Sequence, residues 1–440
     1  MTNHYERLRE HVFGLEIIDT HEHLPAREAD RPKEPDVLAE YLTHYFSCDL
    51  VSAGLSDQQL AVVRDWRKGL RERWRIAEPY WNAARNTAYG RALDIAVRDI
   101  YGFERIDGRT IVPLNEAFVA ARAAGGVYEK VLKRMSKIRV SILDSNLDCD
   151  RKFFRSAVRL DDFVMVSNRS QLGWLAQRAG VKAIHTLADL EAACERAMDD
   201  AFRRGAACLK SGLAYCRSLR YDKVTGADAE AEFNALFADA NIAPSWEMQR
   251  GRTSKLQDYM MHCICRLADA RGLTFQVHTG IQEGTGNYIY HSEPTLLSNL
   301  FLEYPDVKFD IFHIGYPYQH TLSVLAKNFR NVFIDFAWAH AVSPTASINA
   351  LVDYLDAVPA NKISGFGGDY CFVDPVYGHQ LIAREDIAKA LAIKIEQGVF
   401  DPDRAKEVAK MILHDNPAAL FGVKESPKPA ERKKKIRRAK

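Results

Sequence analysis

Leu15-Glu-Ile-Ile-Asp-Thr-His21-Glu-His23-Leu24 is a short apolar run that ends in two histidines. In an extended strand, residues two apart point to the same face, so His21 and His23 can direct both imidazole rings at one point. Neutral imidazole is a common ligand of zinc and similar divalent metals. A buried strand with paired histidines at its carboxyl end would present a metal at the catalytic face of a parallel barrel.

Four later segments follow the same rule, in which an apolar run leads to a metal-competent or ionisable residue close to a glycine. These runs end at Lys210, His278, His313 and Asp369. A single histidine of this kind is more often a core or loop residue, but five runs that obey one rule indicate a shared site. The carboxyl ends of parallel strands meet at one face of a barrel, so we expect these side chains to lie together.

We therefore predict an α/β fold, a (β/α)8 TIM barrel over residues 1–423, because strand and helix patterns alternate along the chain. Residues 25–125 are too long for an ordinary βα loop and are predicted to form a helical insertion, with helices at 57–76 and 89–100. A second insertion, 214–255, follows the fourth strand. The strands are expected at 15–21, 137–143, 154–160, 206–210, 273–278, 307–313, 331–336 and 362–367.

The order of these motifs resembles that of the amidohydrolase superfamily, which consists of metal-dependent (β/α)8-barrel enzymes. That family has HxH after strand 1, often Lys after strand 4, His after strands 5 and 6, and Asp after strand 8. The matching residues here are His21, His23, Lys210, His278, His313 and Asp369. Thr20-His-Glu-His23 and Ala207-Cys-Leu-Lys210 are also similar to the corresponding stretches of phosphotriesterases.

Other features resemble the uronate isomerases within this superfamily. His23-Leu-Pro leads into a long polar and aromatic insert that contains Tyr80-Trp81 and Arg85-Asn86-Thr87. Gln276-Val-His278-Thr-Gly and the stretch from Asp369 to Tyr377-Gly-His379 are similar to the same branch. The resemblance spans roughly residues 15–422 and is strong at these motifs.

The resemblance implies a centre for one or two divalent ions, with zinc expected and manganese or iron as alternatives. His21, His23 and Asp369 would hold one ion and leave a position open for water, as catalytic sites require. Asp369 is also the candidate general base. His278 and His313 would bind a second ion or orient the substrate as catalytic residues. Lys210 would bridge two ions if carboxylated, and otherwise its ammonium would pair with an anionic substrate or with Asp369.

Substrate selection is expected to fall to the two insertions, because they emerge at the carboxyl face of the barrel. Arginine suits planar carboxylates through paired hydrogen bonds, so several arginines near one mouth favour a small anionic substrate such as a sugar acid or its lactone. The candidate substrate-binding residues are Arg85, Arg159, Tyr215, Arg217, Arg220 and His379, with Arg384 close to the last of these in sequence.

Three classes of enzyme remain open. The first is a metal-dependent hydrolase that uses a metal-activated water on a C–N or C–O bond, an amide or a lactone, and His313 favours it because uronate isomerases lack that histidine in the same role. The second is an aldose–ketose isomerase of the uronate isomerase type, which the first insertion and the region after Asp369 favour. A metal-dependent non-oxidative decarboxylase ranks third. The intact ligand set argues against a non-catalytic binding protein.

Composition agrees with an ordinary globular enzyme, since 47% of residues are hydrophobic and 27% are charged. The net charge of +2 conceals a basic tail at residues 424–440, which carries +7 and leaves −5 for residues 1–423. A disordered tail without a nucleic-acid or membrane partner is the expectation. With no apolar run of membrane length, no signal-peptide core and cysteines lying in apolar runs, a cytoplasmic location is predicted. The sequence does not determine the oligomeric state, and a homo-oligomer is one alternative.

Overall fold

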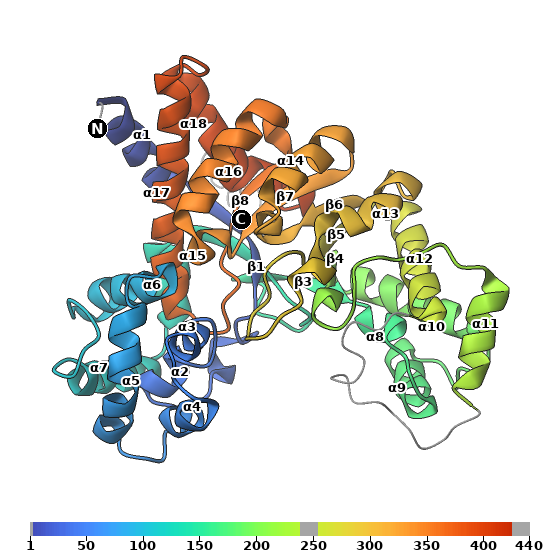
Figure 1. Ribbon diagram of the computed structural model, residues 1–440, viewed down its shortest axis with the longest axis horizontal. Coiled ribbons are helices and arrows are strands. Elements are labelled where there is room, and N and C mark those ends of the chain that lie inside the picture. Colours follow the sequence, from blue (N-terminus) through green and yellow to red (C-terminus); the bar gives the residue numbers. More distant parts are fainter. Residues whose placement is uncertain (1–2, 238–253, 425–440) are drawn as a thin grey trace, which may run out of the picture.

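Eight parallel strands form the centre of the computed structural model, which describes residues 3–237 and 254–424. They pair in chain order within one sheet, from β1 to β8 (Figure 1). Beyond β8 the chain bonds back to β1, because the Asp369 amide donates to the His21 carbonyl at 2.8 Å and the His23 amide to the Tyr370 carbonyl at 3.0 Å. The predicted (β/α)8 barrel is confirmed. The strands are β1 (Ile17–Glu22), β2 (Ile138–Leu143), β3 (Phe154–Arg159), β4 (Ala206–Ser211), β5 (Thr274–Val277), β6 (Lys308–Ile311), β7 (Val332–Ala337) and β8 (Ile363–Gly367).

The predicted strands match the observed ones to within two residues at most ends, because each is an apolar run covered on both faces. Two of the small differences matter for function. β5 ends at Val277 and β6 at Ile311, so His278 and His313 lie beyond their strands rather than in them. His313 has φ 61°, in the left-handed region, which lets the chain turn its ring toward the barrel axis.

Helices surround the barrel between most successive strands. The connection between β2 and β3, residues 144–153, contains no helix. The main covering helices are α10 (Leu187–Arg203), α12 (Lys255–Asp269), α14 (Gln319–Asn328), α16 (Pro344–Ala357), α17 (Asp374–Glu396) and α18 (Pro402–Lys410). No helix of the described ranges is long and apolar enough to cross a membrane.

The N-terminal insertion is helical, as predicted, but the helix expected over 57–76 is two helices. A capping box between Ser56 and Gln59 starts α4 (Asp57–Arg64), and α5 (Leu70–Ala84) begins after a break that ends at Gly69. The remaining elements are α2 (Val37–Tyr41), α3 (Phe46–Ser52), α6 (Ala88–Ala96), η2 (Val97–Tyr101), α7 (Ile111–Ala124) and η3 (Glu129–Met135).

The insertion packs against the first half of α17 (Figure 1). A Cβ atom at Gly378 would collide with the carbonyl oxygen of Ala92, so α6 and α17 can approach this closely only because residue 378 is glycine. The hydroxyls of Tyr41 and Tyr101 both donate to Asp374 Oδ2, at 2.8 and 2.9 Å. These contacts fix the insertion beside the carboxyl face of the barrel.

The second predicted insertion, 214–255, is described only in part. It begins with η4 (Leu213–Tyr215) and includes α11 (Gly226–Ala235), and residues 238–253 lie outside the described residues. The basic tail also lies outside them from residue 425 onward. The domain boundaries given above therefore stay predictions.

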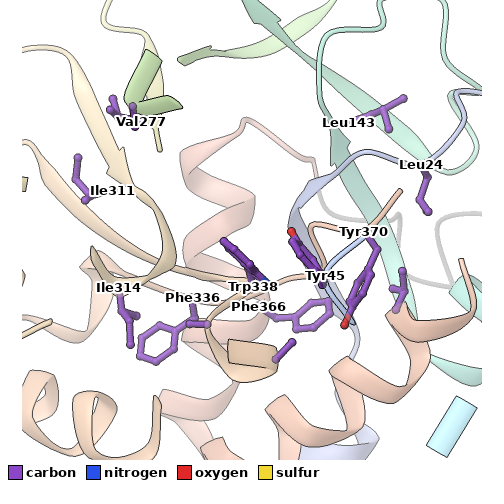
Figure 2. Close-up of a cluster of buried hydrophobic side chains, with 14 of the residues drawn as sticks. Leu24, Tyr45, Leu143, Val277, Ile311, Ile314, Phe336, Trp338, Phe366 and Tyr370 are labelled. Carbon is purple, nitrogen blue, oxygen red and sulfur yellow. The ribbon is translucent and has the colours of Figure 1, made fainter. Parts of the chain in front are cut away.

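Aromatic side chains from the insertion and the barrel meet at the top of β7 and β8 (Figure 2). The Tyr45 ring stacks on Trp338 with centroids 4.4 Å apart, and Tyr370 meets Tyr45 edge-on at 5.2 Å. All three are almost completely buried. This contact makes the insertion part of the wall around the barrel mouth.

The barrel interior contains an unusual pair of buried carboxyl groups, Asp310 on β6 and Asp335 on β7. Asp310 accepts a hydrogen bond from Gln276 Nε2 at 3.1 Å, and Asp335 accepts one from Thr20 Oγ1 at 2.9 Å. Burial raises the pKa of Asp310 to about 6 and raises the pKa of Asp335 well above its ordinary value. Two adjacent buried carboxyl groups cannot both ionise without a large penalty, so the pair retains a proton near neutral pH.

This pair should make the fold more stable at mildly acidic pH. Both groups have higher pKa values in the folded than in the unfolded chain, so their contribution is complete below about pH 4, the unfolded value, and is lost as pH rises through the folded values. In Asp335→Asn the pair carries no second charge, and we expect the fall in unfolding free energy between pH 5 and pH 8 to shrink by roughly 1–3 kcal/mol. Urea unfolding of metal-free protein at both pH values measures this. An unchanged fall would contradict the shared proton.

Candidate metal centre

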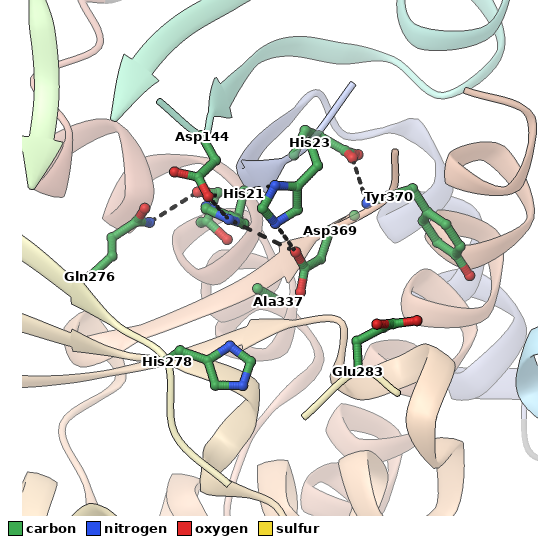
Figure 3. Close-up of polar contacts among 12 residues, drawn as sticks. His21, His23, Asp144, Gln276, His278, Glu283, Ala337, Asp369 and Tyr370 are labelled. Carbon is green, nitrogen blue, oxygen red and sulfur yellow. Dashed lines mark hydrogen bonds and ion pairs between the residues drawn. The ribbon is translucent and has the colours of Figure 1, made fainter. Parts of the chain in front are cut away.

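Side chains from the ends of β1, β2, β5 and β8 meet at the carboxyl face of the barrel (Figure 3). His313, which follows β6, lies beside His278. His21 lies within β1 and His23 directly after it, so both rings point to the same side, as their spacing predicts. Asp369 follows β8 with φ 60°, a left-handed conformation that aspartate adopts more readily than most residues. The structure therefore brings the predicted metal-ligating histidines and Asp369 together.

His21 is almost completely buried, with 1% of its side chain exposed. Neither of its ring nitrogens has a hydrogen-bond partner among the described residues. Burial, with the nearby Lys210 charge, lowers the pKa of His21 well below its usual value, so the ring is neutral. A buried neutral imidazole with two unsatisfied nitrogens is costly unless it serves as a ligand.

His23 and Asp369 form a close pair. His23 Nε2 lies 3.1 Å from Asp369 Oδ1, and His21 Nε2 lies 3.8 Å from the same oxygen. Burial alone would raise the pKa of Asp369, but the contact with His23 and the other nearby histidines hold that pKa well below its usual value. About a third of the His23 side chain (34%) is exposed, so the centre is open on this side.

Asp144 also reaches the centre, although the sequence reasoning above did not include it. It follows β2 directly, and its Oδ2 lies 3.5 Å from His23 Nδ1 and 3.8 Å from His21 Nε2. Arg159, the last residue of β3, pairs with both oxygens of Asp144, through Nη2 and through Nε at 3.1 Å. Burial opposes ionisation of Asp144, but the Arg159 charge holds the pKa of this carboxyl far below its usual value. Asp144 therefore stays anionic.

His278 and His313 form a second pair of rings. His278 Nε2 lies 2.9 Å from the Ile281 carbonyl, and His313 Nδ1 lies 2.8 Å from the Ala337 carbonyl. Carbonyl oxygens only accept hydrogen bonds, so both outer nitrogens carry protons, and the inner nitrogens face each other at 3.0 Å. Burial lowers the pKa of both rings, that of His313 to about 4. Two facing lone pairs suit a shared proton or a cation.

Lys210 is buried in β4 with its ammonium against an aromatic ring, and its charge helps to lower the pKa of His21, His278 and His313. Its Nζ lies 3.2 Å from the centroid of the Phe312 ring. Burial lowers the pKa of Lys210 to about 8, so a fraction of these amines is neutral at physiological pH. A neutral buried amine is the form that carboxylation requires, but that modification stays a prediction.

The residues present fit a divalent ion. Among the described residues, His21, His23 and Asp144 each offer a ligand atom, and these three atoms lie within 4.8 Å of one another. Two imidazoles and a carboxylate are a donor set that catalytic zinc sites use. Carbonyl partners also fix the tautomers of His278 and His313, as outer partners of metal-bound histidines do. The carboxylate near these two rings is Asp369, whose Oδ2 lies 3.8 Å from His313 Nε2.

Two of the predicted substrate-binding residues adjoin the centre. Arg159 contacts Asp144, and 35% of its side chain remains exposed. The Tyr215 ring centroid lies 4.6 Å from that of His278. The Tyr215 hydroxyl accepts a hydrogen bond from the Glu283 amide at 3.0 Å. Both also line a cavity of about 990 Å³ that runs beside β3. Their substrate role stays a prediction, now with a location.

The other predicted arginines have partners elsewhere, and His379 is buried within the fold. Arg217 is buried against Asp258 and Gln257, and Arg220 pairs with Asp222 at the surface. Arg85 donates to the Ile106 carbonyl and faces Asp94. His379 is buried in α17 behind Phe366 and Tyr370, and Arg384 holds the carbonyls of Val12, Leu15 and Ser136. The structure does not bring these five side chains to the histidines.

Besides Asp144, the residues Tyr45 and Glu283 line the centre without having been predicted. The Tyr45 hydroxyl donates to the Asp369 carbonyl at 2.5 Å, and the Tyr45 ring is tilted against that of its neighbour His44, with centroids 3.8 Å apart. Glu283, in the loop after β5, accepts from Cys48 Sγ at 3.7 Å and lies near Asp369 and His278 in Figure 3. Asp144 could have been found, because it follows an apolar run as Asp369 does. Tyr45 and Glu283 follow no such run.

Solved structures of similar architecture extend over almost the whole chain. A uronate isomerase from Thermotoga maritima has a TM-score of 0.77 at 15% identity and covers 96% of this chain and 98% of its own. A glucuronate isomerase from Caulobacter crescentus has a TM-score of 0.76 at 18% identity and covers 96% and 95%. At such identities the similarity shows the fold, here the barrel together with its helical insertion.

Sequence comparison gives the family. Protein fluG of Emericella nidulans is 25% identical over 224 residues, which are 50% of this chain and 26% of fluG, so the chain spans only about a quarter of that relative. The family model for amidohydrolases, Amidohydro_2, matches residues 146–423, more than half of the chain and the part that contains β3 to β8. The protein therefore belongs to the amidohydrolase family.

Proposed function

We propose that the protein is a one-metal isomerase that interconverts the aldose and ketose forms of a small sugar acid. The observation that carries the proposal is the position of the N-terminal insertion, which closes one side of the metal centre through Tyr45. This residue contacts Asp369 and stacks on Trp338. The uronate isomerases that the fold resembles match this chain over its full insertion and barrel, which supports the same use of the insertion.

The donor set supports a single ion. Among the described residues, His21, His23 and Asp144 place three ligand atoms within 4.8 Å of one another, whereas the inner nitrogens of His278 and His313 lie only 3.0 Å apart. A divalent ion bound by these three atoms would polarise oxygens of the substrate. His278 and His313 would then be left to bind and orient substrate hydroxyls.

The reaction needs little more than proton movement between neighbouring atoms. One proton leaves C2 of the aldose and one arrives at C1, while a hydroxyl proton passes from O2 to O1, so no water or redox partner is consumed. Asp369 is anionic and adjoins the open side of the centre, and it can accept a proton. Arg159 and the Lys210 ammonium are the cations of the centre that can favour an anionic substrate.

Isomerisation of hexuronates tests the proposal. Metal-loaded protein should convert an aldouronate into its ketose in D2O, with a single deuterium incorporated next to the carbonyl carbon in at least part of the product, as NMR would show. The corresponding neutral hexose serves as the control and should react poorly. Absence of conversion for both glucuronate and galacturonate would contradict the proposed function.

A hydrolase is the second candidate, because His313 contacts both His278 and, at 3.8 Å, Asp369 Oδ2. The sequence favoured this class for the same histidine. A hydrolase acting on an amide or lactone of a sugar acid should incorporate labelled oxygen from solvent into the product. An isomerase does not need to incorporate oxygen from solvent, so labelled water separates the two classes.

Metal content gives a separate prediction. The purified protein, expressed with added metal, should contain one equivalent of a divalent ion by elemental analysis, since the described residues contain one group of three ligand atoms. Two equivalents would contradict the one-ion centre and favour the hydrolase, with Lys210, His278 and His313 as ligands. A metal content below about a tenth of an equivalent would contradict a metal enzyme of either kind.

A further inference from the structure

We propose that the substrate is longer than a single sugar acid, and that the cavity beside β3 binds an uncharged sugar chain attached to it. The reacting hexuronate would be the reducing end of a short oligosaccharide. This inference rests on the proposed isomerase and adds the class of its substrate. It depends on the size of the cavity, on its connection to the metal centre, on the balance of its charges and on the exposed ring of Trp174.

The cavity offers far more space than one sugar acid fills. Its volume is about 990 Å³, at the upper end of the range of about 300–1,000 Å³ in which sites bury whole drug-sized ligands. A hexuronate is smaller than such ligands, with about 13 non-hydrogen atoms, and its reacting carbons would lie at the metal centre rather than in the cavity. The size therefore favours a substrate with further groups attached.

Two residues border both the metal centre and the cavity. Arg159 donates to Asp144 at the centre and also lines the cavity. The Tyr215 ring lies against that of His278, with centroids 4.6 Å apart, and Tyr215 lines the cavity as well. A ligand that begins at the histidines can therefore continue past Arg159 and Tyr215 into the cavity.

The chemistry of a hexuronate indicates where the chain is attached. C1 and C2 react and must lie at the metal centre, while the carboxylate at C6 suits the half-exposed Arg159 guanidinium at the border of the cavity. O1 and O2 exchange a proton in the reaction, and O5 closes the ring of the cyclic sugar, so none of these three can carry the chain. Of the two hydroxyls that remain, O4 is nearer to the carboxylate than O3. A chain on O4 would therefore extend into the cavity.

The charges on the cavity wall cancel. Among the described residues that line the cavity, the arginines are as numerous as the acidic residues, and they are Arg159, Arg178, Arg204, Asp148, Asp161 and Asp162. Arg178 pairs with Asp162 at 2.8 Å, and Arg204 pairs with Asp148 at 3.1 Å. Such pairs keep donors and acceptors for further hydrogen bonds but present no net charge. The wall therefore suits hydroxyl groups better than a second carboxylate.

Trp174 provides a flat apolar surface within this polar wall. It lies on α9 (Arg169–Ala179), where Leu172 and Leu175 are buried but the Trp174 side chain lines the cavity and is 51% exposed. The Arg178 guanidinium lies over the ring, 5.7 Å from its centroid, and helps to hold it in place. One face of a sugar ring carries mainly C–H groups, so it can pack on an indole while its hydroxyls bond to the polar groups nearby. Trp174 is thus the residue on which the sugar chain would pack.

Binding of analogues that cannot react tests the proposal on the metal-loaded protein. The probes are a C1-reduced hexuronate and the C1-reduced trisaccharide that carries two neutral hexoses on O4, since neither has a carbonyl group to isomerise. Calorimetry should show that the trisaccharide binds at least about 10-fold more tightly than the monosaccharide. Equal or weaker binding of the trisaccharide would overturn the proposal. Tighter binding of a reduced trisaccharide made only of hexuronates would overturn it too, because the wall has no net charge.

Variants of two exposed tryptophans show whether the gain in affinity comes from the cavity. Trp174→Ala should reduce the ratio of trisaccharide to monosaccharide affinity to within about 3-fold of one, and Trp174→Phe should retain more of it, because an aromatic face remains. Trp66 is the matched control, since it is 44% exposed and lies between α4 and α5, outside the residues that line the cavity. Trp66→Ala should keep the full ratio. A ratio as large in Trp174→Ala as in the unmodified protein would overturn the proposal.

The binding test is independent of the proposed reaction. If no hexuronate is isomerised but the reduced trisaccharide binds more tightly through Trp174, the function is wrong and the cavity is assigned correctly. If hexuronates are isomerised and the reduced trisaccharide gains no affinity, the function stands and the cavity is assigned wrongly. Thermal unfolding of each variant shows whether a lost affinity reflects a lost fold.

Discussion

Asp369→Asn is expected to lose about 10²–10⁴-fold in turnover while it keeps at least part of its metal. The amide retains the shape of the side chain and one coordinating oxygen but cannot take a proton at neutral pH. That loss is the usual contribution of a positioned general base. In the unmodified protein the neighbouring histidines keep this carboxyl anionic, so it is ready to accept a proton across the neutral range.

Measuring kcat and bound metal on the same preparation tests this prediction. Asp353→Asn offers a matched control, because Asp353 pairs with His320 at the surface of the protein and should change neither quantity. A variant of Asp369 with its full metal and near-normal turnover on the true substrate would show that Asp369 is not the base.

His21→Ala is expected to remove metal and activity together. The side chain is buried, and neither ring nitrogen has a hydrogen-bond partner among residues 3–237 and 254–424, which a bound ion would explain. Its loss removes one of three ligands and leaves the Asp144 and Asp369 charges less well compensated. We expect bound metal to fall below about a tenth of an equivalent and turnover to fall at least as far as in Asp369→Asn.

A histidine at the surface provides the comparison. His320 has 78% of its side chain exposed, so His320→Ala should retain metal and turnover. Circular dichroism and thermal unfolding of His21→Ala should match those of the metal-free unmodified protein. If His21→Ala instead keeps a full equivalent of metal, the ion is bound elsewhere, and the centre described here is wrong.

The barrel could be predicted because its strands are local in sequence. Each is an apolar run that ends at a polar residue, and parallel strands place those ends on one face. His21, His23, His278, His313 and Asp369 therefore meet as predicted, although their sequence positions span most of the chain. The ends of β5 and β6 were misplaced by one or two residues because the chain turns before each histidine, and hydrophobic patterns do not record such turns.

The substrate residues could not be predicted equally well, because an arginine's partner is set by the tertiary fold. Arg217 and Arg220 follow β4 closely, yet Asp258 holds the first and Asp222 the second. Asp144, in contrast, was left out of the predicted site although its sequence position indicated it. It obeys the rule that identified Asp369, and its ionic partner Arg159 was predicted for the substrate instead. Tyr45 lies in the insertion, where only packing determines which side chains reach the barrel.

The comparison of enzyme classes also changed with the structure. His313 made a hydrolase the leading prediction, whereas the isomerase that ranked second is the function we propose, because the insertion contacts Asp369 through Tyr45. The sequence could show that residues 25–125 were an insertion. It could not show that this segment closes the metal centre.

The glycine contact between α6 and α17 has a consequence for protein engineering. Substrate range in this family could be altered by exchanging the insertion between relatives, but the insertion is not a self-contained module. Ala92 requires glycine at position 378, and Tyr41 and Tyr101 require Asp374. A functional chimera would have to carry residues 25–125 together with the first half of α17. These two segments would have to be exchanged together, although they are more than 200 residues apart in the sequence.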